Sequence, residues 1–405
     1  MRIGGNRGVR LPNFKESLLK HGIENTEPPE RLYIPVPEAL LEQLQPGEAF
    51  RRGQFLWENE YHLPVYCPAD GVAEDVVRIS HPLFGDGCYL VLSEVKRPRA
   101  PIPLPKNTPA ELAEKARCAA ILDETDGVPL FLKLKSLKGF GGTLVVDATA
   151  ADPYMAASAG VLAEDPALVL RGLELAAAYT GAARYGVTVT PDADGGRDVR
   201  RTLRGHLFVT GKKYPADRLT PRYCPKPIAV LGVQALAALA KAEDRGEVAD
   251  TCVVTVHGDR VRHPRNLRVL TGTPAPHALA SCGARPAELL ILGGVMTGTP
   301  CDTDDFPVAA GVTCLLAMGP HKQEKVLACT GCGACIRVCH RDLIPCEISR
   351  LLGNMQYDRL PALEAKRCDG CGACSYVCPA KREVTADVLR AGEIQHTIFV
   401  DLEDG

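Results

Sequence analysis

The sequence lacks the features that mark several common classes of protein. Lysine and arginine number 47 against 49 aspartates and glutamates, and the resulting net charge of −2 predicts no basic surface for nucleic acid or an anionic membrane. The longest apolar run, residues 228–240, is too short and too rich in alanine to span a bilayer. The opening segment MRIGGNRGVR has basic residues but no apolar stretch behind it, so no signal peptide is expected. No serine triad, catalytic cysteine or metal-hydrolase motif is found, and no catalytic residue is assigned.

Cysteine, by contrast, is abundant, and eight of the 17 cysteines lie between residues 329 and 378. They form two copies of the pattern C-x-x-C-x-x-C-x-x-x-C, the second followed by Pro379. Two-cluster ferredoxins hold a pair of [4Fe–4S] clusters with this spacing, and the fourth cysteine of each run serves the other cluster. We expect that fourth cysteine at the start of a helical segment. The spacing therefore assigns one cluster to Cys329, Cys332, Cys335 and Cys378, and the other to Cys368, Cys371, Cys374 and Cys339.

Other roles for these cysteines agree less well with the spacing. Structural zinc accounts for C-x-x-C pairs, but not for a third and a fourth cysteine repeated twice. A disulfide framework needs an oxidising compartment, whereas many thiols and labile clusters predict a cytoplasmic location. His340 stands where the pattern usually has proline, so the surroundings of one cluster should differ. Cys346 is interpreted as a buried or spare thiol and not as a ligand.

A chain of 405 residues is too long for one hydrophobic core. Residues 1–105 predict a small β-rich domain, with strands at 32–36 and 87–92 between proline and glycine. The phrases PGEAFRRGQ and CPADGV look like the turns of a lipoyl-type barrel-sandwich hybrid. The turn that would carry the lipoyl-lysine has Ala69-Asp70-Gly71, so lipoylation is not expected and the module is interpreted as structural.

Residues 106–225 alternate between helix and strand, which predicts an α/β domain with a largely parallel sheet. The glycines of residues 139–142 precede a strand instead of following it, so they predict a turn and not a phosphate loop. Residues 192–201 are interpreted as a polar loop. The expected helices cover residues 109–122 and 165–179, and the expected strands cover 143–147 and 186–190.

Residues 226–320 predict a compact sheet with one crossing helix, of β-grasp type. The cluster domain follows at residues 321–393, and the tail 394–405 is expected to be an edge strand or loose. The expected helices are 228–243 and 277–282, and the expected strands are 251–257, 267–271 and 288–292. The fold class predicted for the whole chain is multidomain, α/β and α+β.

In the order of these blocks the chain resembles the C subunit of the Rnf electron-transport complex and its relatives. Those relatives include the flavin- and NADH-binding subunit of respiratory complex I and the cobalamin-reductase-like proteins of microcompartments. The resemblance is carried by the two N-terminal phrases, the doubled cysteine motif, and residues 253–258, 264–267 and 271–274. It implies a divergent, Rossmann-like flavin- and NADH-type domain at residues 106–225, and a soluble-ligand-binding β-grasp domain at residues 226–320.

The chain departs from this family where flavin and nucleotide would bind. The family's loop GxGGAGFPTxxK appears as residues 126–133, which keep one glycine, the proline and Lys133. Bulky side chains there would obstruct the approach of phosphate to backbone amides. The acidic family phrase Glu-Cys-Glu-Pro-Tyr keeps only Asp152, Pro153 and Tyr154, and the family's lysine is missing from residues 306–311. The resemblance leaves Lys133, Asp152 and Tyr154 as candidate cofactor-binding remnants; FMN is disfavoured, and a divergent flavin or nucleotide site stays open.

Electron transfer is the function that the sequence favours. Two [4Fe–4S] clusters would relay electrons between redox protein partners or the subunits of an electron-transfer complex. Peripheral attachment to a membrane complex stays open. An FMN-dependent NADH dehydrogenase that uses the clusters is the second hypothesis, although NADH oxidation by this chain alone is not expected. A third is a β-grasp module that holds a cobalamin-like or other soluble ligand, and a fourth is a structural protein whose clusters only stabilise the domain.

Overall fold

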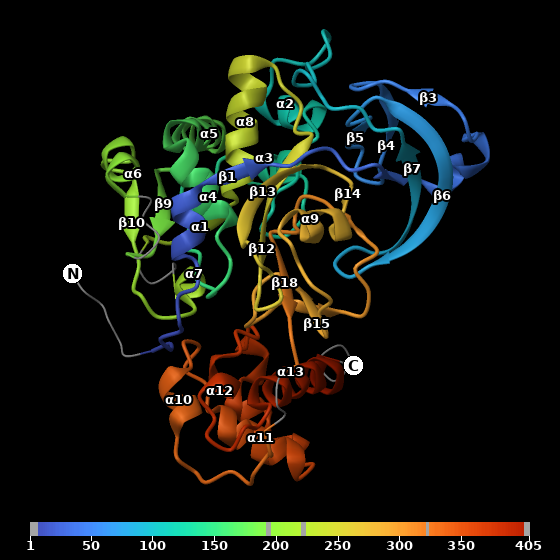
Figure 1. Cartoon of the computed structure of the whole chain (residues 1–405). Coiled ribbons are helices and arrows are strands. Elements are labelled where there is room, and N and C mark those ends of the chain that lie inside the picture. The colour runs from blue at the N-terminus through green and yellow to red at the C-terminus, as the bar shows by residue number, and fades with distance from the viewer. Residues whose placement is uncertain (1–6, 192–195, 220–223, 321–323, 401–405) are drawn as a thin grey trace.

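The computed structural model describes residues 7–191, 196–219, 224–320 and 324–400. Within these ranges the chain forms a mixed α/β multidomain fold with several sheets and a helical carboxyl-terminal region. Figure 1 shows the sheet-containing regions together, with the helices of the cysteine-rich region below them. No helix in the described ranges combines the length and the apolar composition needed to cross a membrane.

The β-rich region is built on a four-stranded antiparallel sheet and a separate hairpin. Burial alternates along the first strand, with Leu32, Ile34 and Val36 inward, as expected for a sheet that covers a core with one face. Trp57 of the hairpin joins this core, and its indole N–H donates to the Pro35 carbonyl at 2.9 Å. The sheet runs in the order β2 (Leu32–Val36), β7 (Gly85–Ser93), β6 (Gly71–His81) and β3 (Ala49–Phe50), and the hairpin joins β4 (Phe55–Glu58) to β5 (Pro64–Tyr66).

The α/β region contains a four-stranded parallel sheet, as the alternation of helix and strand predicts. Its order is β10 (Leu207–Val209), β9 (Arg184–Val189), β8 (Thr143–Asp147) and β11 (Ile228–Leu231). The chain winds outward from β8 through β9 to β10, and then returns to the other side of β8 as β11. Ligands of open parallel sheets bind beyond the carboxyl ends of the strands where the winding reverses in this way.

Helices pack around this sheet. The longest of them, α5, confirms the helix predicted at residues 165–179, and its N-cap Asp165 accepts a hydrogen bond from the Leu168 N–H at 2.9 Å. Gly172 lets α5 approach α8 (Val233–Arg245) closely, because a Cβ there would lie 2.0 Å from the Leu236 carbonyl oxygen. The helices are α2 (Leu112–Cys118), α3 (Leu130–Ser136), α4 (Ala157–Glu164), α5 (Pro166–Thr180), α6 (Gly196–Thr202), α7 (Ala216–Leu219) and α8 (Val233–Arg245).

The structure corrects three predictions in this region. The helix predicted at residues 228–243 starts only at Val233, because Ile228–Leu231 form β11 and Gly232 separates the two elements. A short apolar run fits either a strand or a helix, and the open edge beside β8 favours the strand. Residues 196–201, predicted as loop, belong to α6, where Val199 is buried; residues 192–195 lie outside the described residues. The helix predicted at 109–122 is limited to α2, and Ala120 beyond it has a positive φ of 56°.

The third region is a mixed six-stranded sheet. The strand predicted at residues 251–257 is confirmed as β12, which pairs antiparallel with β13 and parallel with β18. The segment ahead of the β-rich region, with α1 (Glu16–His21), adds β1 in parallel to one edge of this sheet. The order is β1 (Ile23–Asn25), β13 (Arg265–Leu270), β12 (Thr251–His257), β18 (Cys314–Met318), β15 (Leu289–Leu292) and β16 (Thr299–Cys301), with α9 (Ala275–Ser281) and the short pair β14 (Thr273–Pro274) and β17 (Pro307–Val308) beside it.

The cysteine-rich region is helical and has its own small core. Val384, Val388 and Ala391 are buried at helical spacing along α13 and face this core. The prediction of an edge strand or a loose tail is therefore wrong, because the chain is helical as far as Val400; residues 401–405 lie outside the described residues. The elements are α10 (Ala334–Val338), α11 (Pro345–Gly353), the 3-10 turns Tyr357–Arg359, Pro361–Leu363 and Ala365–Arg367, α12 (Ala373–Tyr376) and α13 (Val384–Val400).

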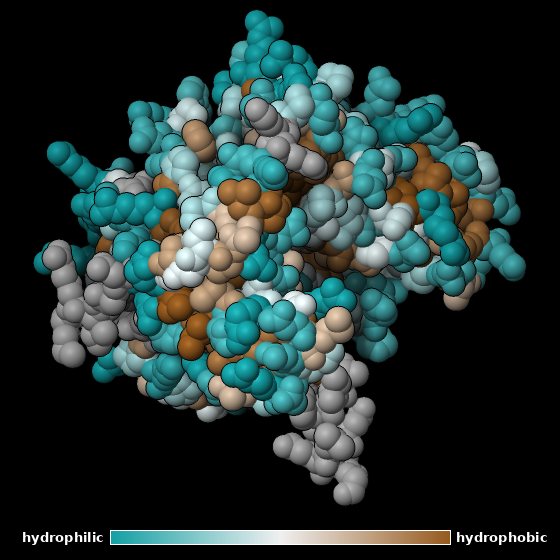
Figure 2. All heavy atoms as spheres, turned by 90° about the horizontal axis from the view of Figure 1, so that it is seen from below, coloured by the Kyte–Doolittle hydropathy of each residue, from teal (hydrophilic) through white to brown (hydrophobic). Residues whose placement is uncertain are grey.

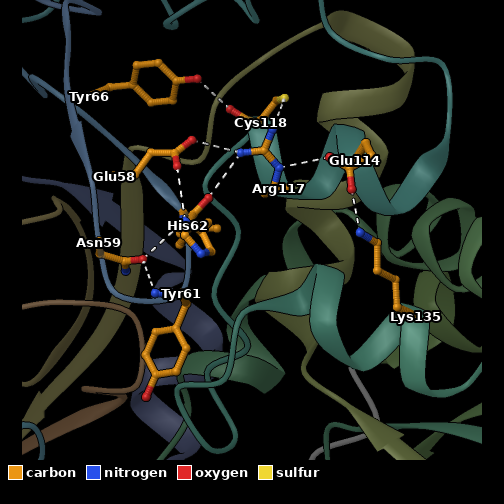
Figure 3. A network of polar contacts seen from close by, with 10 residues as sticks. Glu58, Asn59, Tyr61, His62, Tyr66, Glu114, Arg117, Cys118 and Lys135 are labelled. Atoms are coloured by element: carbon orange, nitrogen blue, oxygen red, sulfur yellow. Dashed lines mark hydrogen bonds and ion pairs between the residues drawn. The ribbon is translucent and has the colours of Figure 1, made fainter.

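Arg117 of α2 holds the β-rich region against the α/β region (Figure 3). Its guanidinium donates to Glu58 at 3.2 Å and to the His62 carbonyl at 3.1 Å, where the β4–β5 hairpin turns. On its own helix it pairs with Glu114 at 2.9 Å. The Tyr66 hydroxyl adds a bond to the Cys118 carbonyl at 2.9 Å. These contacts place the hairpin next to α2.

Candidate metal centre

The first cysteine run lies on a loop that leads into α10. Cys329 and Cys332 are exposed, and Cys335 in α10 is buried. Gly331 and Gly333, between the cysteines, both have φ of 68°, a conformation that glycine adopts without strain. These two residues let the loop fold back so that its thiols converge.

The second run repeats this arrangement before α12. Gly370 and Gly372 have φ values of 70° and 78°, and Cys371 and Cys374 are buried. In both runs the third cysteine lies in a short helix and the fourth follows it: Cys339 caps the carboxyl end of α10, and Cys378 comes after α12. The prediction that the fourth cysteine starts a helix is therefore wrong. The helix begins earlier, directly after the second glycine of each run.

The thiols lie in two groups that combine the runs. Cys378 borders one cavity together with Cys329, Cys332 and Cys335. Cys339 of the first run is close enough to Cys368 and Cys374 for its charge to raise the pKa of both thiols, after the larger effect of burial. All 17 cysteines are free thiols, so no disulfide competes for these sulfur atoms.

The donor set fits iron–sulfur clusters. Each group offers several free thiols, and burial raises the pKa of Cys335 and Cys371 to about 12. Such thiols favour the protonated form unless a metal ion replaces the proton. The Gly370 N–H donates to Cys368 Sγ at 3.4 Å, and Thr385 Oγ1 lies 3.1 Å from Cys374 Sγ. Hydrogen bonds to ligand sulfur are one means by which a protein tunes a cluster's potential.

His340 contributes a polar group beside the second run. Its Nε2 lies 2.7 Å from Asp369 Oδ2, and its Nδ1 lies 3.8 Å from Cys371 Sγ. Ligand atoms of these three residues lie within 4.8 Å of one another. Burial alone would raise the pKa of Asp369, but His340 and Arg218 together lower it. The position where proline is usual thus holds an imidazole in contact with a cysteine of the second group.

The second run also faces the α/β region. The Tyr214 hydroxyl donates to the Cys371 carbonyl at 2.6 Å, and Arg218 pairs with Asp369 at 3.0 Å. An amino-terminal arm adds a bond from the Gly8 N–H to the Val338 carbonyl at 2.9 Å. Tyr214 and Arg218 were not predicted as site residues, since nothing near them in the sequence forms a motif. Their role depends on the packing of distant segments.

Tyr214 and Arg218 also border a crevice of about 430 Å³ at the carboxyl end of β8. This is the place where the winding of the parallel sheet reverses, and where ligands of such folds bind. Acids outnumber bases among the charged residues of its lining, and burial, followed by the charge of Asp147, raises the pKa of Asp217 to about 6. The charged residues around the crevice are Glu124, Asp147, Asp152, Asp217 and Arg218.

The three candidate cofactor-binding residues do not form one group. Asp152 borders the crevice and accepts hydrogen bonds from the backbone N–H groups of Tyr154 and Met296, each at 3.1 Å. The Tyr154 ring stacks on Phe14 with centroids 4.8 Å apart. Lys133, in α3, pairs instead with two acids of the segment before that helix, namely Asp123 at 2.9 Å and Asp126 at 2.7 Å.

Asp123 and its neighbour Glu124 were not predicted as site residues. Glu124 accepts hydrogen bonds from the Gln234 and Ala235 N–H groups, at 2.8 and 3.1 Å, and Asp123 accepts one from the Gly232 N–H at 3.1 Å. These amides form the start of α8, the kind of site that attracts phosphate groups. The pair Asp123–Glu124, immediately before the altered glycine loop, was the available signal. The carboxylates of Asp123 and Glu124 thus occupy the backbone N–H groups at the start of α8.

Comparison with known proteins identifies the class. A family model described as a 4Fe-4S dicluster domain matches residues 328–382. Together with the two thiol groups, this match defines an iron–sulfur protein with a dicluster domain, and it implies two [4Fe–4S] clusters.

More particularly, the chain is Rnf C-like, and the resemblance noted in the sequence is confirmed. The C subunit of the ion-translocating oxidoreductase complex from Vibrio cholerae is 26% identical over 400 residues, covering 89% of this chain and 51% of that protein. Its counterpart from Rhodobacter capsulatus is 34% identical over 146 residues, 35% of this chain and 28% of that protein. The chain therefore spans about half, or less, of the length of these curated relatives.

A solved structure of NAD+-reducing [NiFe]-hydrogenase in the air-oxidized state also matches the chain. The TM-score is 0.44 at 12% sequence identity, and the match covers 62% of this chain and 54% of the other.

Proposed function

We propose that the chain relays electrons between redox proteins through two [4Fe–4S] clusters. The eight cysteines of its two runs lie in two groups of thiols on a small domain, and this observation carries the proposal. One group would comprise Cys329, Cys332, Cys335 and Cys378, and the other Cys368, Cys371, Cys374 and Cys339. Because each group draws one cysteine from the other run, the two clusters would lie close together, as transfer between them requires.

The two groups of thiols differ in their surroundings, and this difference suggests which cluster exchanges electrons with an outside partner. Cys329 and Cys332 are exposed, so the first cluster would lie near the surface. The second group contacts Tyr214 and Arg218, which border the crevice of the α/β region. We infer that one redox partner reaches the first cluster directly, and that the second cluster faces the interior of the protein or of its complex.

A partner surface lies beside the exposed cysteines. Val326 and Leu327 are 61% and 53% exposed just before Cys329. Figure 2 shows the face on this side of the molecule, where apolar side chains form several small patches among polar ones. Small mixed patches suit a transient contact between redox proteins. By analogy with its relatives, the chain would be one component of a multisubunit, ion-translocating oxidoreductase complex.

The remaining regions would then be the scaffold of this family. The antiparallel sheet and hairpin support a barrel-sandwich hybrid within residues 1–105, and the parallel sheet supports a divergent flavin- and NADH-type domain within residues 106–225. The mixed sheet with α9 supports a soluble-ligand-binding β-grasp domain within residues 226–320. The cluster domain would occupy residues 321–393, although α13 continues beyond it.

An FMN-dependent NADH dehydrogenase is the second candidate, because the crevice occupies the ligand-binding end of the parallel sheet. Two observations disfavour it. Asp123 and Glu124 occupy the amides at the start of α8, and four acids against one arginine line the crevice, an excess of negative charge that repels phosphate groups. We therefore propose that neither FMN nor NADH binds there, and that Lys133, Asp152 and Tyr154 have structural roles.

The test combines cluster analysis with reduction kinetics. Anaerobically purified protein should contain about eight irons and about eight sulfides per chain, and dithionite should bleach a broad absorption band. NADH should leave that band unchanged in a stopped-flow experiment, with or without added FMN. Tightly bound zinc without sulfide would refute the cluster proposal. Rapid bleaching by NADH plus FMN, saturable in NADH, would restore the dehydrogenase.

A further inference from the structure

A fifth thiol borders the cavity of the first cysteine group. Cys346, near the start of α11, lines it together with Cys329, Cys332, Cys335 and Cys378. Ser349, one turn further along α11, lines the same cavity. Residues three apart lie on one face of a helix, so this face of α11 is turned toward the thiols. The cavity thus has one sulfur more than a [4Fe–4S] cluster needs.

Cys335 is the immediate neighbour of this extra thiol. The side chains of Cys335 and Cys346 are hydrogen-bonded to each other. The two cysteines belong to different helices, α10 and α11, which pack against each other. Either thiol therefore reaches the same part of the cavity from its own helix.

The second group has a hydroxyl in the equivalent position. Cys374 is the third cysteine of its run, as Cys335 is of the first, and its sulfur lies 3.1 Å from Thr385 Oγ1. A thiolate is the ligand that iron–sulfur clusters take from proteins, and a threonine hydroxyl is not. The two third cysteines thus differ in the side chain from the following long helix: Cys346 lies beside Cys335, and Thr385 lies beside Cys374.

We propose that Cys346 is a reserve ligand of the first cluster, able to take the place of Cys335. The proposal rests on the proposed assignment of Cys335 as a cluster ligand. Cys346 Sγ would then hold the cluster together with Cys329, Cys332 and Cys378, so that the cluster would keep four thiolate ligands. The proton of the Cys346 thiol would move to Cys335, so that protons and charge balance. No electron is transferred and no other reactant is needed.

The test compares alanine variants of the two third cysteines in the full chain, purified anaerobically. Cys335→Ala should keep about eight irons per chain and the paramagnetic signals of two four-iron clusters, because Cys346 ligates in its place. Cys374→Ala, the matched control, should lose iron and show a three-iron signal. Cys346→Ala should keep both clusters, and Cys335→Ala combined with Cys346→Ala should lose the iron that each single variant keeps.

Three results would overturn the inference. Cys335→Ala could lose as much iron as Cys374→Ala, the double variant could hold as much iron as Cys335→Ala, or Cys335→Ala could fail to fold while Cys374→Ala folds. Wild-type protein without iron and sulfide would instead refute the proposed function itself. Iron, sulfide and Mössbauer measurements report on ligation directly and do not depend on any activity of the chain.

Discussion

Replacing Arg218 by methionine should loosen the contact between the cysteine-rich region and the α/β region. Arg218 donates to the backbone carbonyl of Asp369 and forms an ion pair with its carboxylate at 3.0 Å. The two side chains are only 27% and 19% exposed, so water screens the interaction little. Methionine keeps most of the length and the apolar stem of the side chain and removes the charge.

The size of the effect follows from the contact that is lost. A hydrogen bond from a charged group contributes about 1.5–3 kcal/mol. Since about 1.4 kcal/mol corresponds to a factor of ten, the undocked state should become roughly 10- to 100-fold more populated. The Gly8 amide reports on this state, because it bonds across the same contact to the Val338 carbonyl. Its hydrogen exchange, measured by mass spectrometry, should accelerate by a similar factor.

Arg341 provides a matched control. It also pairs with Asp369, at 3.0 Å, but it belongs to the cysteine-rich region itself. Arg341→Met should therefore leave the exchange of the Gly8 amide almost unchanged. Equal acceleration in both variants, or none in Arg218→Met, would refute the reasoning that Arg218 holds the two regions together.

Two further predictions concern the clusters and the acidic cap of α8. Cys378→Ala should damage the cluster proposed for Cys329, Cys332 and Cys335, as judged by Mössbauer and paramagnetic resonance spectra; loss of the other cluster alone would contradict the crossed assignment. Burial, followed by the charge of Asp123, raises the pKa of Glu124 to about 7 from 4.5. The folded chain then holds this proton more tightly than the unfolded chain. Protonated Glu124 therefore makes its full contribution to the free energy of unfolding below pH 4.5, and this contribution is lost as the pH rises through 7. The measurement is urea unfolding followed by circular dichroism. Between about pH 5 and 7 the free energy of unfolding should fall less in Glu124→Gln than in the wild type, by on the order of 3 kcal/mol. An unchanged slope would show that Glu124 titrates normally.

The sequence by itself determined the chemistry of the metal centre. The spacing of the eight cysteines and the glycines between them can be read from the sequence of each run. Within a run, local chain geometry is enough to bring the first three thiols together. The departures of the glycine loop around Lys133 were equally visible, since they concern residue types at adjacent positions. The strands at residues 143–147 and 251–257 could also be predicted, because their apolar patterns admit few other structures.

The tertiary structure decided what depends on contacts between distant segments. Ile228–Leu231 form a strand because the parallel sheet offers a free edge, which no local pattern reveals. Arg218 meets Asp369 only after the two regions dock. Asp123 and Glu124 fill the start of α8 through contacts between segments that lie far apart in the sequence. Cys346, a spare thiol in the sequence, faces the first cysteine group because α11 packs on α10, and this arrangement of helices determines its chemistry.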